Sequence, residues 1–135
     1  HFIGDLEDNR IPDENKFLMN ETEQLTKNNK KLNLVFAFNY GSRKEIHDAY
    51  TKLNKNSIDQ LDEESFRANL LLPEMPDPDL LIRTAGEKRV SNFLLYQLSY
   101  TELMFVDTLW PDFDEKELDS AVDEFQNRVR KYGNA

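Results

Sequence analysis

The sequence lacks cysteine, long apolar runs and any excess of positive charge, and each absence excludes a class of protein. Without cysteine there are no disulfide bonds, thiolate metal sites or thiol nucleophiles. The longest apolar run in the first half, Leu34 to Phe38, is far shorter than a membrane-spanning helix, and no secretory signal is visible. With 17 Lys and Arg against 26 Asp and Glu, the net charge of −9 argues against a nucleic-acid-binding surface. We therefore expect a cytoplasmic chain without a nucleic-acid partner.

What is present suits one domain or part of one. The 135 residues are 39% apolar and include nine Phe and five Tyr, enough to build a core. Strands are expected at residues 1–4, 32–40, 79–83 and 101–106. Helices are expected at residues 12–27 and 114–132, and from Ser42, Asp62 and Ser91 onwards. This alternation, without hairpin signals, predicts an α/β fold with a mostly parallel sheet flanked by helices.

The apolar pattern also predicts which faces are buried. Leu32 to Tyr40 is nearly continuous in apolar residues, which is typical of a parallel strand covered on both faces. Phe17, Leu18 and Leu25 are expected on the buried side of the first helix. The last helix carries one narrow apolar stripe, formed by Leu118, Val122, Phe125, Val129 and Tyr132.

Capping residues predict where three of the helices begin. Ser42 is followed three residues later by Glu45, the pattern of a capping box. Asp62 and Asp114 each precede a helical pattern, and an Asp side chain can accept the unpaired N–H groups of the first turn.

The most informative segment is residues 76–113, which reads PDPDLLIRTAGEKRVSNFLLYQLSYTELMFVDTLWPDF. Asp79 to Arg83 is a short apolar run that follows two prolines, which indicates a buried strand. The loop Thr84 to Val90 comes next, and Ser91 and Asn92 are both good helix N-caps. The segment therefore predicts a strand, a short loop and the start of a helix.

The turn between this strand and the expected helix has the composition of an anion site. From Arg83 to Ser91 there are three basic residues and one acid, a local excess of positive charge in an acidic chain. Unpaired N–H groups at a helix start and the planar guanidinium fork both suit phosphate oxygens. A phosphorylated ligand is therefore predicted. The alternative is a solvated loop whose arginines pair with Glu74, Asp77 or Glu87.

Three motifs resemble one family in the same order along the chain. The run DPDLLIRTAGEKRVSNFLLYQLSYTELMFVDTLWPDF resembles the C-terminal signature of the cis-prenyltransferases, above all the bacterial undecaprenyl diphosphate synthases. NYGSRKEI, at Asn39 to Ile46, and FIGD, at Phe2 to Asp5, resemble the same family. The resemblance implies an enzyme that condenses isopentenyl diphosphate with an allylic diphosphate such as farnesyl diphosphate. The product would be a long cis-polyprenyl diphosphate for cell-wall synthesis, and Mg²⁺ would assist.

The resemblance also implies roles for particular residues. Arg83 and Arg89 would bind the phosphate oxygens of isopentenyl diphosphate, and Ser91 with the backbone at Val90 would complete the cradle. Glu102 matches the family's metal-associated glutamate and would bind Mg²⁺. On the residues alone, the favoured interpretation of Glu102 is a strand-end carboxylate paired with a base, and the motif reverses this preference.

The sequence departs from the family pattern in several places. No Asp-Gly-Asn occurs, although the family carries its catalytic Asp in such a motif near its start. Residues 1–135 are therefore expected to be the C-terminal portion of one cis-prenyltransferase domain, without a catalytic residue and inactive alone. Ala85 stands where Ser or Gly is usual, and Lys131 stands where the C-terminal pattern usually has Arg.

The sequence is also compatible with two other functions. The chain could be a non-catalytic partner subunit that stabilises a catalytic cis-prenyltransferase, although a pure scaffold needs no phosphate cradle. It could also be a phosphate-binding α/β domain of another family. By resemblance to the first family, we expect a homodimer and peripheral contact with the membrane for product release.

Overall fold

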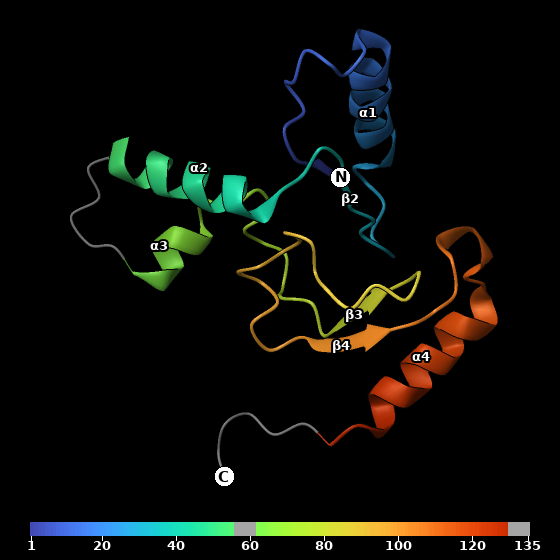
Figure 1. Ribbon diagram of the computed structural model, residues 1–135. Helices are drawn as coiled ribbons and strands as arrows, with labels where there is room; N and C mark the ends of the chain where they lie inside the picture. Colours follow the sequence, from blue (N-terminus) through green and yellow to red (C-terminus); the bar gives the residue numbers. More distant parts are fainter. Residues whose placement is uncertain (56–61, 130–135) are drawn as a thin grey trace. The chain divides into compact units, whose positions relative to one another are not determined.

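The computed structural model of the chain describes residues 1–55 and 62–129 (Figure 1). It divides into two compact units, His1–Met75 and Pro76–Ala135. Each unit contains one pair of parallel strands together with helices, so the predicted α/β class is confirmed. Within the two described ranges, no helix combines the length and apolar character needed to cross a membrane.

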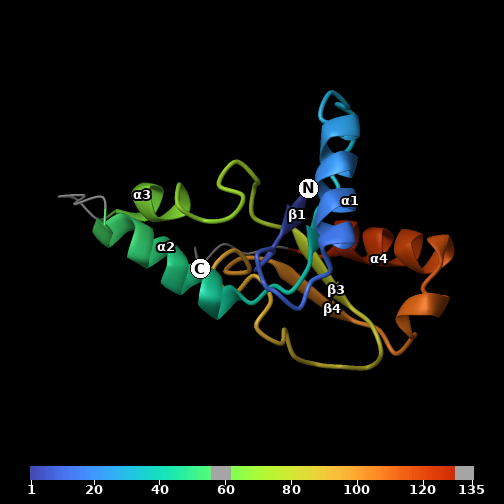
Figure 2. The same ribbon diagram turned by 90° about the horizontal axis from the view of Figure 1, so that it is seen from above.

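The sheet of the first unit is short. β1 (Phe2–Ile3) pairs in parallel with β2 (Phe36–Ala37) (Figure 2). The Phe2 and Phe36 rings lie opposite each other and stack, with their centroids 5.3 Å apart. The expected strand at the start of the chain is therefore confirmed.

The chain that leaves β1 passes very close to the chain that leaves β2. Gly4 has a φ of +132°, and a Cβ at this position would stand 1.9 Å from the carbonyl oxygen of Phe38. The N–H of Asp5 donates to the carbonyl oxygen of Asn39 at 3.2 Å. Only glycine, which has no Cβ, permits both this φ and this approach.

Three helices belong to the first unit: α1 (Asp13–Thr26), α2 (Ser42–Lys55) and α3 (Glu63–Arg67). α3 begins after Asp62, as predicted. The Asp62 carboxylate accepts the N–H of Ser65 at 2.8 Å, and the Ser65 hydroxyl accepts the N–H of Asp62 at 3.1 Å. This reciprocal pair is a capping box, in which two unpaired donors of the first turn are satisfied.

α2 is anchored by its buried face, on which Ala49 and Leu53 are fully buried. Glu45 is buried as well. Its Oε1 accepts the N–H of Leu71 at 3.0 Å, and its Oε2 accepts the hydroxyl of Tyr40 at 2.5 Å. A buried carboxylate is tolerated only when it is hydrogen-bonded, so these contacts also tie α2 to the segment that follows α3.

The sheet of the second unit consists of β3 (Leu80–Arg83) and β4 (Glu102–Phe105), which run parallel over four residues each. Both strands lie where the sequence predicted them. Leu81 and Met104 are buried and form the core of this pair.

The second unit continues through the 3₁₀ helix η1 (Trp110–Asp112) to α4 (Glu115–Asn127). α4 begins after the predicted cap, because the Asp114 carboxylate accepts the N–H of Glu117 at 3.1 Å. The predicted end of this helix is wrong: Arg128 already has an extended backbone. The remaining part of the prediction, residues 130–132, lies outside the described residues.

The predictions of burial are wrong for several segments. β2 has two residues instead of spanning residues 32–40, and Phe36 is 50% exposed. No residue of α1 is buried, and Phe17, Leu18 and Leu25 are 63%, 49% and 77% exposed. An apolar pattern identifies the face that can be buried, but it does not supply the element that covers this face. The apolar stripe of the last helix is exposed in the same way at Leu118, Val122 and Val129.

Candidate functional site

Arg83 is the last residue of β3, at the carboxyl end of the β3–β4 pair. Ligands of parallel α/β sheets lie beyond this edge. The residue is half-buried, and its Nε is buried without a hydrogen-bond partner among the described residues. An unpaired buried donor on a charged group is unfavourable by several kcal/mol. The position therefore fits a side chain whose acceptor is a ligand.

Arg89 lies at the other end of the same loop and is largely exposed, with 66% of its side chain accessible. Its guanidinium forms an ion pair with the carboxylate of Glu87. The alternative prediction of a solvated loop, in which arginines pair with nearby acids, therefore describes Arg89 in this structure. An exposed ion pair of this kind contributes little to stability, so the guanidinium can exchange its partner readily.

The predicted helix after the loop is wrong. Residues 91–100 form a series of turns, and Ser91, Asn92 and Leu94 have φ values of 47°, 63° and 45°. These left-handed conformations interrupt a right-handed helix. A single short helix is marginal in water unless it buries an apolar face, and Phe93 remains 37% exposed.

Without a helix after the loop, the predicted cradle at Val90 and Ser91 must bind an anion in another way. Ser91 is exposed, and the carbonyl oxygen of Val90 accepts the N–H of Phe93 at 2.9 Å, which closes a turn. Without a helix there is no summed dipole to attract an anion. What remains is a sequence of turns, and successive backbone N–H groups in turns can still form a concavity for an anion.

Glu102 is the first residue of β4 and lies opposite Leu80. Its Oε2 accepts a hydrogen bond from Nη1 of Arg128 at 2.9 Å, while Nη2 of Arg128 bonds to Glu124 at 2.6 Å. These two carboxylates, Glu124 before Glu102, raise the pKa of Arg128 above its ordinary value. The second of the two predictions for Glu102, a strand-end carboxylate paired with a base, describes this contact.

The structure does not bring Glu102 to the loop that carries the arginines. Arg83 is opposite Phe105, at one end of the strand pair, and Glu102 is opposite Leu80, at the other end. Three residues of parallel strand span roughly 10 Å. In the part of the chain that the structure describes, no group of three His, Cys, Asp or Glu side chains is placed to hold a metal ion.

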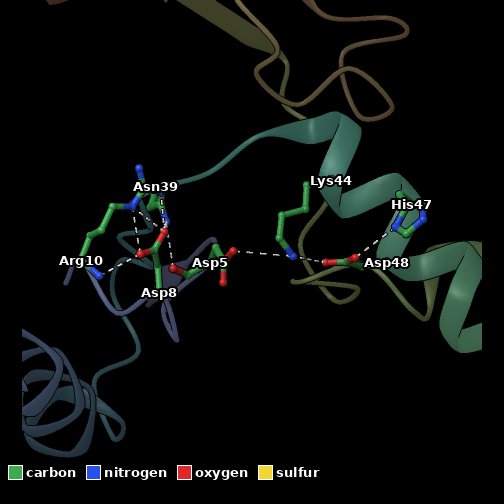
Figure 3. Close-up of polar contacts among 7 residues, drawn as sticks. All are labelled: Asp5, Asp8, Arg10, Asn39, Lys44, His47 and Asp48. Carbon is green, nitrogen blue, oxygen red and sulfur yellow. Dashed lines mark hydrogen bonds and ion pairs between the residues drawn. The ribbon is translucent and has the colours of Figure 1, made fainter.

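Sequence reasoning missed a second cluster, where the chain leaves β1 and β2. Nδ2 of Asn39 donates to the carbonyl oxygen of Asp5 at 3.1 Å and to Oδ2 of Asp8 at 3.2 Å (Figure 3). Asp8 also accepts from Arg10, with Nη2 to Oδ2 at 2.5 Å. The side-chain and backbone hydrogen bonds from Arg10 hold the pKa of Asp8 well below its usual range.

The same network extends to α2 and borders a cavity of about 510 Å³ in the first unit. Nζ of Lys44 lies 2.6 Å from Asp48 and 3.8 Å from Asp5 (Figure 3). The available signal was Asn39, since an Asn between a strand and a glycine tolerates a left-handed φ, here 49°. The charged groups of this network pair with one another, in contrast to the Nε of Arg83, which has no partner among the described residues.

The comparisons with known proteins agree on one family. Residues 1–133 match the family model described as "Putative undecaprenyl diphosphate synthase". The isoprenyl transferase of Fusobacterium nucleatum is 48% identical over 125 residues, which are 93% of this chain and 54% of that protein. The farnesyl-diphosphate-specific ditrans,polycis-undecaprenyl-diphosphate synthase of Micrococcus luteus is 45% identical over 137 residues, with 97% and 54% covered.

Solved structures show the same relationship. The crystal structure of a probable undecaprenyl diphosphate synthase from Campylobacter jejuni matches with a TM-score of 0.86 and 38% identity, covering 98% of this chain and 62% of that one. Lavandulyl diphosphate synthase from Lavandula x intermedia, solved with dimethylallyl diphosphate, matches with a TM-score of 0.90 and 36% identity, covering 98% and 58%. The chain spans about half the length of the curated relatives it matches. It belongs to the undecaprenyl diphosphate synthase family of cis-prenyltransferases.

Proposed function

We propose that this chain carries the isopentenyl diphosphate site of a cis-prenyltransferase. The whole enzyme would condense isopentenyl diphosphate with an allylic diphosphate, such as farnesyl diphosphate, to a long cis-polyprenyl diphosphate of the undecaprenyl type. Family membership supports the reaction class. The single observation that carries the site is the buried Nε of Arg83 at the carboxyl end of β3, which has no partner in the part of the chain that the structure describes.

The site is formed by residues 83–91, which we call the diphosphate loop. Arg83 is fixed at its start by the strand pair, and its Nε requires an acceptor. Arg89 can exchange the carboxylate of Glu87 for a diphosphate oxygen, because a diphosphate carries more negative charge than a carboxylate. The Ser91 hydroxyl and the backbone at Val90 would supply the remaining donors.

Magnesium fits these residues only in part. When bound, Mg²⁺ would stabilise the departing pyrophosphate. Glu102 is the one acid that we assign to it, and this carboxylate is bound to Arg128. The described residues do not form a magnesium site of their own. We therefore expect that residues 1–135 alone do not elongate prenyl chains. Polyprenyl product from the purified chain with both substrates and Mg²⁺ would refute this expectation.

A non-catalytic partner subunit is the second candidate, and two contacts favour it. Arg89 is paired with Glu87, and Glu102 is paired with Arg128, so two of the assigned side chains already have protein partners. A scaffold would keep these pairs permanently.

For the first candidate, the whole enzyme, we also propose that it forms a homodimer, lies in the cytoplasm and contacts the membrane transiently.

Calorimetric titration of isopentenyl diphosphate into the chain separates the two candidates. The enzyme proposal predicts saturable binding that weakens with salt and falls about tenfold or more in Arg89→Ala, because a hydrogen bond to a charged group contributes about 1.5–3 kcal/mol. Lys88→Ala is the matched control: it removes the neighbouring charge but no assigned contact, so its effect should be smaller. Absence of binding to the unsubstituted chain would favour the scaffold.

A further inference from the structure

We propose that Thr108 and Glu117 are positioning residues for the diphosphate loop. The Thr108 carbonyl oxygen accepts from Ala85 and the Thr108 hydroxyl donates to Glu117, so the two residues help to hold the turn at Ala85 and Gly86. This turn sets the direction in which the loop carries Arg89. The inference rests on the proposed function, because it concerns the affinity of the same site. None of the motifs that resemble the family assigns a role to either residue.

The turn at the centre of the diphosphate loop is strained. Ala85 has a φ of 64° and Gly86 a φ of 66°, so both residues are left-handed. Glycine adopts this conformation freely, but alanine does not, because its Cβ approaches the backbone. A left-handed alanine persists only where the surrounding structure holds it. Contacts from neighbouring segments must therefore hold Ala85 in this conformation.

The segment after β4 supplies these contacts. The N–H of Ala85 donates to the carbonyl oxygen of Thr108 at 2.8 Å, and the N–H of Gly86 donates to that of Val106 at 2.9 Å. The N–H of Val106 in turn donates to the carbonyl oxygen of Arg83 at 2.9 Å. Val106 and Thr108 thus bind the start of the loop at three residues, Arg83, Ala85 and Gly86. Ala85 keeps its hydrogen bond only while the carbonyl oxygen of Thr108 stays in this position.

Thr108 is itself held from α4. Its hydroxyl donates a hydrogen bond to Oε1 of Glu117, and Oε2 of Glu117 is buried without a partner among the described residues. Buried polar atoms are nearly always hydrogen-bonded, so an unpaired carboxylate oxygen in this place calls for an explanation. The backbone of Glu117 is fixed in the first turn of α4, where its N–H donates to the Asp114 carboxylate at 3.1 Å. Glu117 acts as a fixed acceptor that orients Thr108.

The test is isopentenyl diphosphate binding to the full chain with Thr108→Val, which removes the hydroxyl and keeps the shape. We expect affinity to fall about fivefold, within the range of coupled contacts, and amide exchange at Ala85 and Gly86 to accelerate. Thr108→Ser keeps the hydroxyl and should restore both values. Thr101→Val is the matched control, because the Thr101 hydroxyl bonds to the Pro78 carbonyl at the opposite end of the strand pair.

Glu117→Ala gives an independent test in case Thr108→Val does not fold. It removes the acceptor from a helix in which alanine is favourable, and it should lower affinity by the same factor. The double variant should bind no more weakly than either single variant, since both act through one hydrogen bond. Unchanged affinity and unchanged amide exchange in Thr108→Val and Glu117→Ala would overturn the inference alone. No binding to the unsubstituted chain would overturn the proposed function and the inference together.

Discussion

Both units place polar residues just beyond the carboxyl ends of a parallel strand pair, but they treat these residues differently. Beyond β1 and β2, Asp5, Asp8, Arg10 and Asn39 bond to one another (Figure 3). At the last residue of β3, the Nε of Arg83 is buried with no partner among the described residues. A matched network stabilises the turn that it occupies. An unmatched buried donor weakens its own unit, and a ligand that accepts from it removes this weakness.

Gly4→Ala is expected to have the largest effect on stability, because a side chain at residue 4 would clash with the backbone that follows β2. The new Cβ would meet the Phe38 carbonyl oxygen at 1.9 Å, and φ is +132°. We expect a loss of about 3 kcal/mol or more in the free energy of unfolding, measured by urea denaturation. Gly86→Ala is the matched substitution in the second unit, where the new Cβ would lie 3.1 Å from Oδ1 of Asp107. The free energy of unfolding should fall by about 1 kcal/mol in this variant. Equal losses in the two variants would contradict this comparison of the two turns.

Arg83→Met tests the unmatched donor directly. Isopentenyl diphosphate binding should weaken by about tenfold or more, while the free energy of unfolding of the unliganded chain stays the same or rises, since no unpaired donor is left buried. Arg10→Met is the control from the matched network, and it should leave binding unchanged. Calorimetry and denaturation of both variants are the measurements. A large loss of stability in Arg83→Met would show that the guanidinium has a structural partner.

Ala85→Gly tests the backbone strain in the turn of the second unit, because glycine adopts a positive φ freely. With a φ of 64°, alanine at this position is strained by about 1–2 kcal/mol, and the extra freedom of glycine in the unfolded chain cancels part of the gain. We expect a net stabilisation of about 0.5 kcal/mol in thermal or urea unfolding. Destabilisation would mean that the alanine side chain has packing contacts that outweigh its strain.

The smallest effect concerns pH and the matched network. The pKa of Asp8 is held below its usual range by its hydrogen bonds to Arg10, so the folded chain binds fewer protons than the unfolded chain. Its contribution to stability is therefore full above the ordinary Asp pKa of about 4 and is lost as the pH falls below it. The Arg10 side chain that pairs with Asp8 is 84% exposed, so salt should reduce the effect. Asp8→Asn should remove this part of the acid dependence, and an unchanged acid profile would show that the network contributes nothing.

Local signals predicted much of this molecule. Asp62 and Asp114 cap helices as expected, and the apolar run at Asp79 to Arg83 forms β3. The helix after Ser91 could not be ruled out from the sequence, because Ser and Asn favour both helix caps and isolated turns. Only the left-handed backbone at these residues decides between them.

Long-range contacts were beyond sequence reasoning. The pairing of Glu102 with Arg128 and of Thr108 with Glu117 depends on where α4 lies, which no local pattern gives. The burial of Phe17 and Leu25 was predicted from periodicity, yet periodicity says nothing about what covers a face. The resemblance identified Arg83, but its buried and unpaired Nε became visible only in the structure.

The most direct test of the central claim is the ¹H–¹⁵N resonance of Arg83 Nε in the arginine-labelled chain. On addition of isopentenyl diphosphate, we expect this resonance to shift and its proton to exchange more slowly with water, because Nε gains an acceptor. Isopentenol, which lacks the diphosphate, should leave it unchanged. A resonance that does not respond to saturating isopentenyl diphosphate would contradict the account.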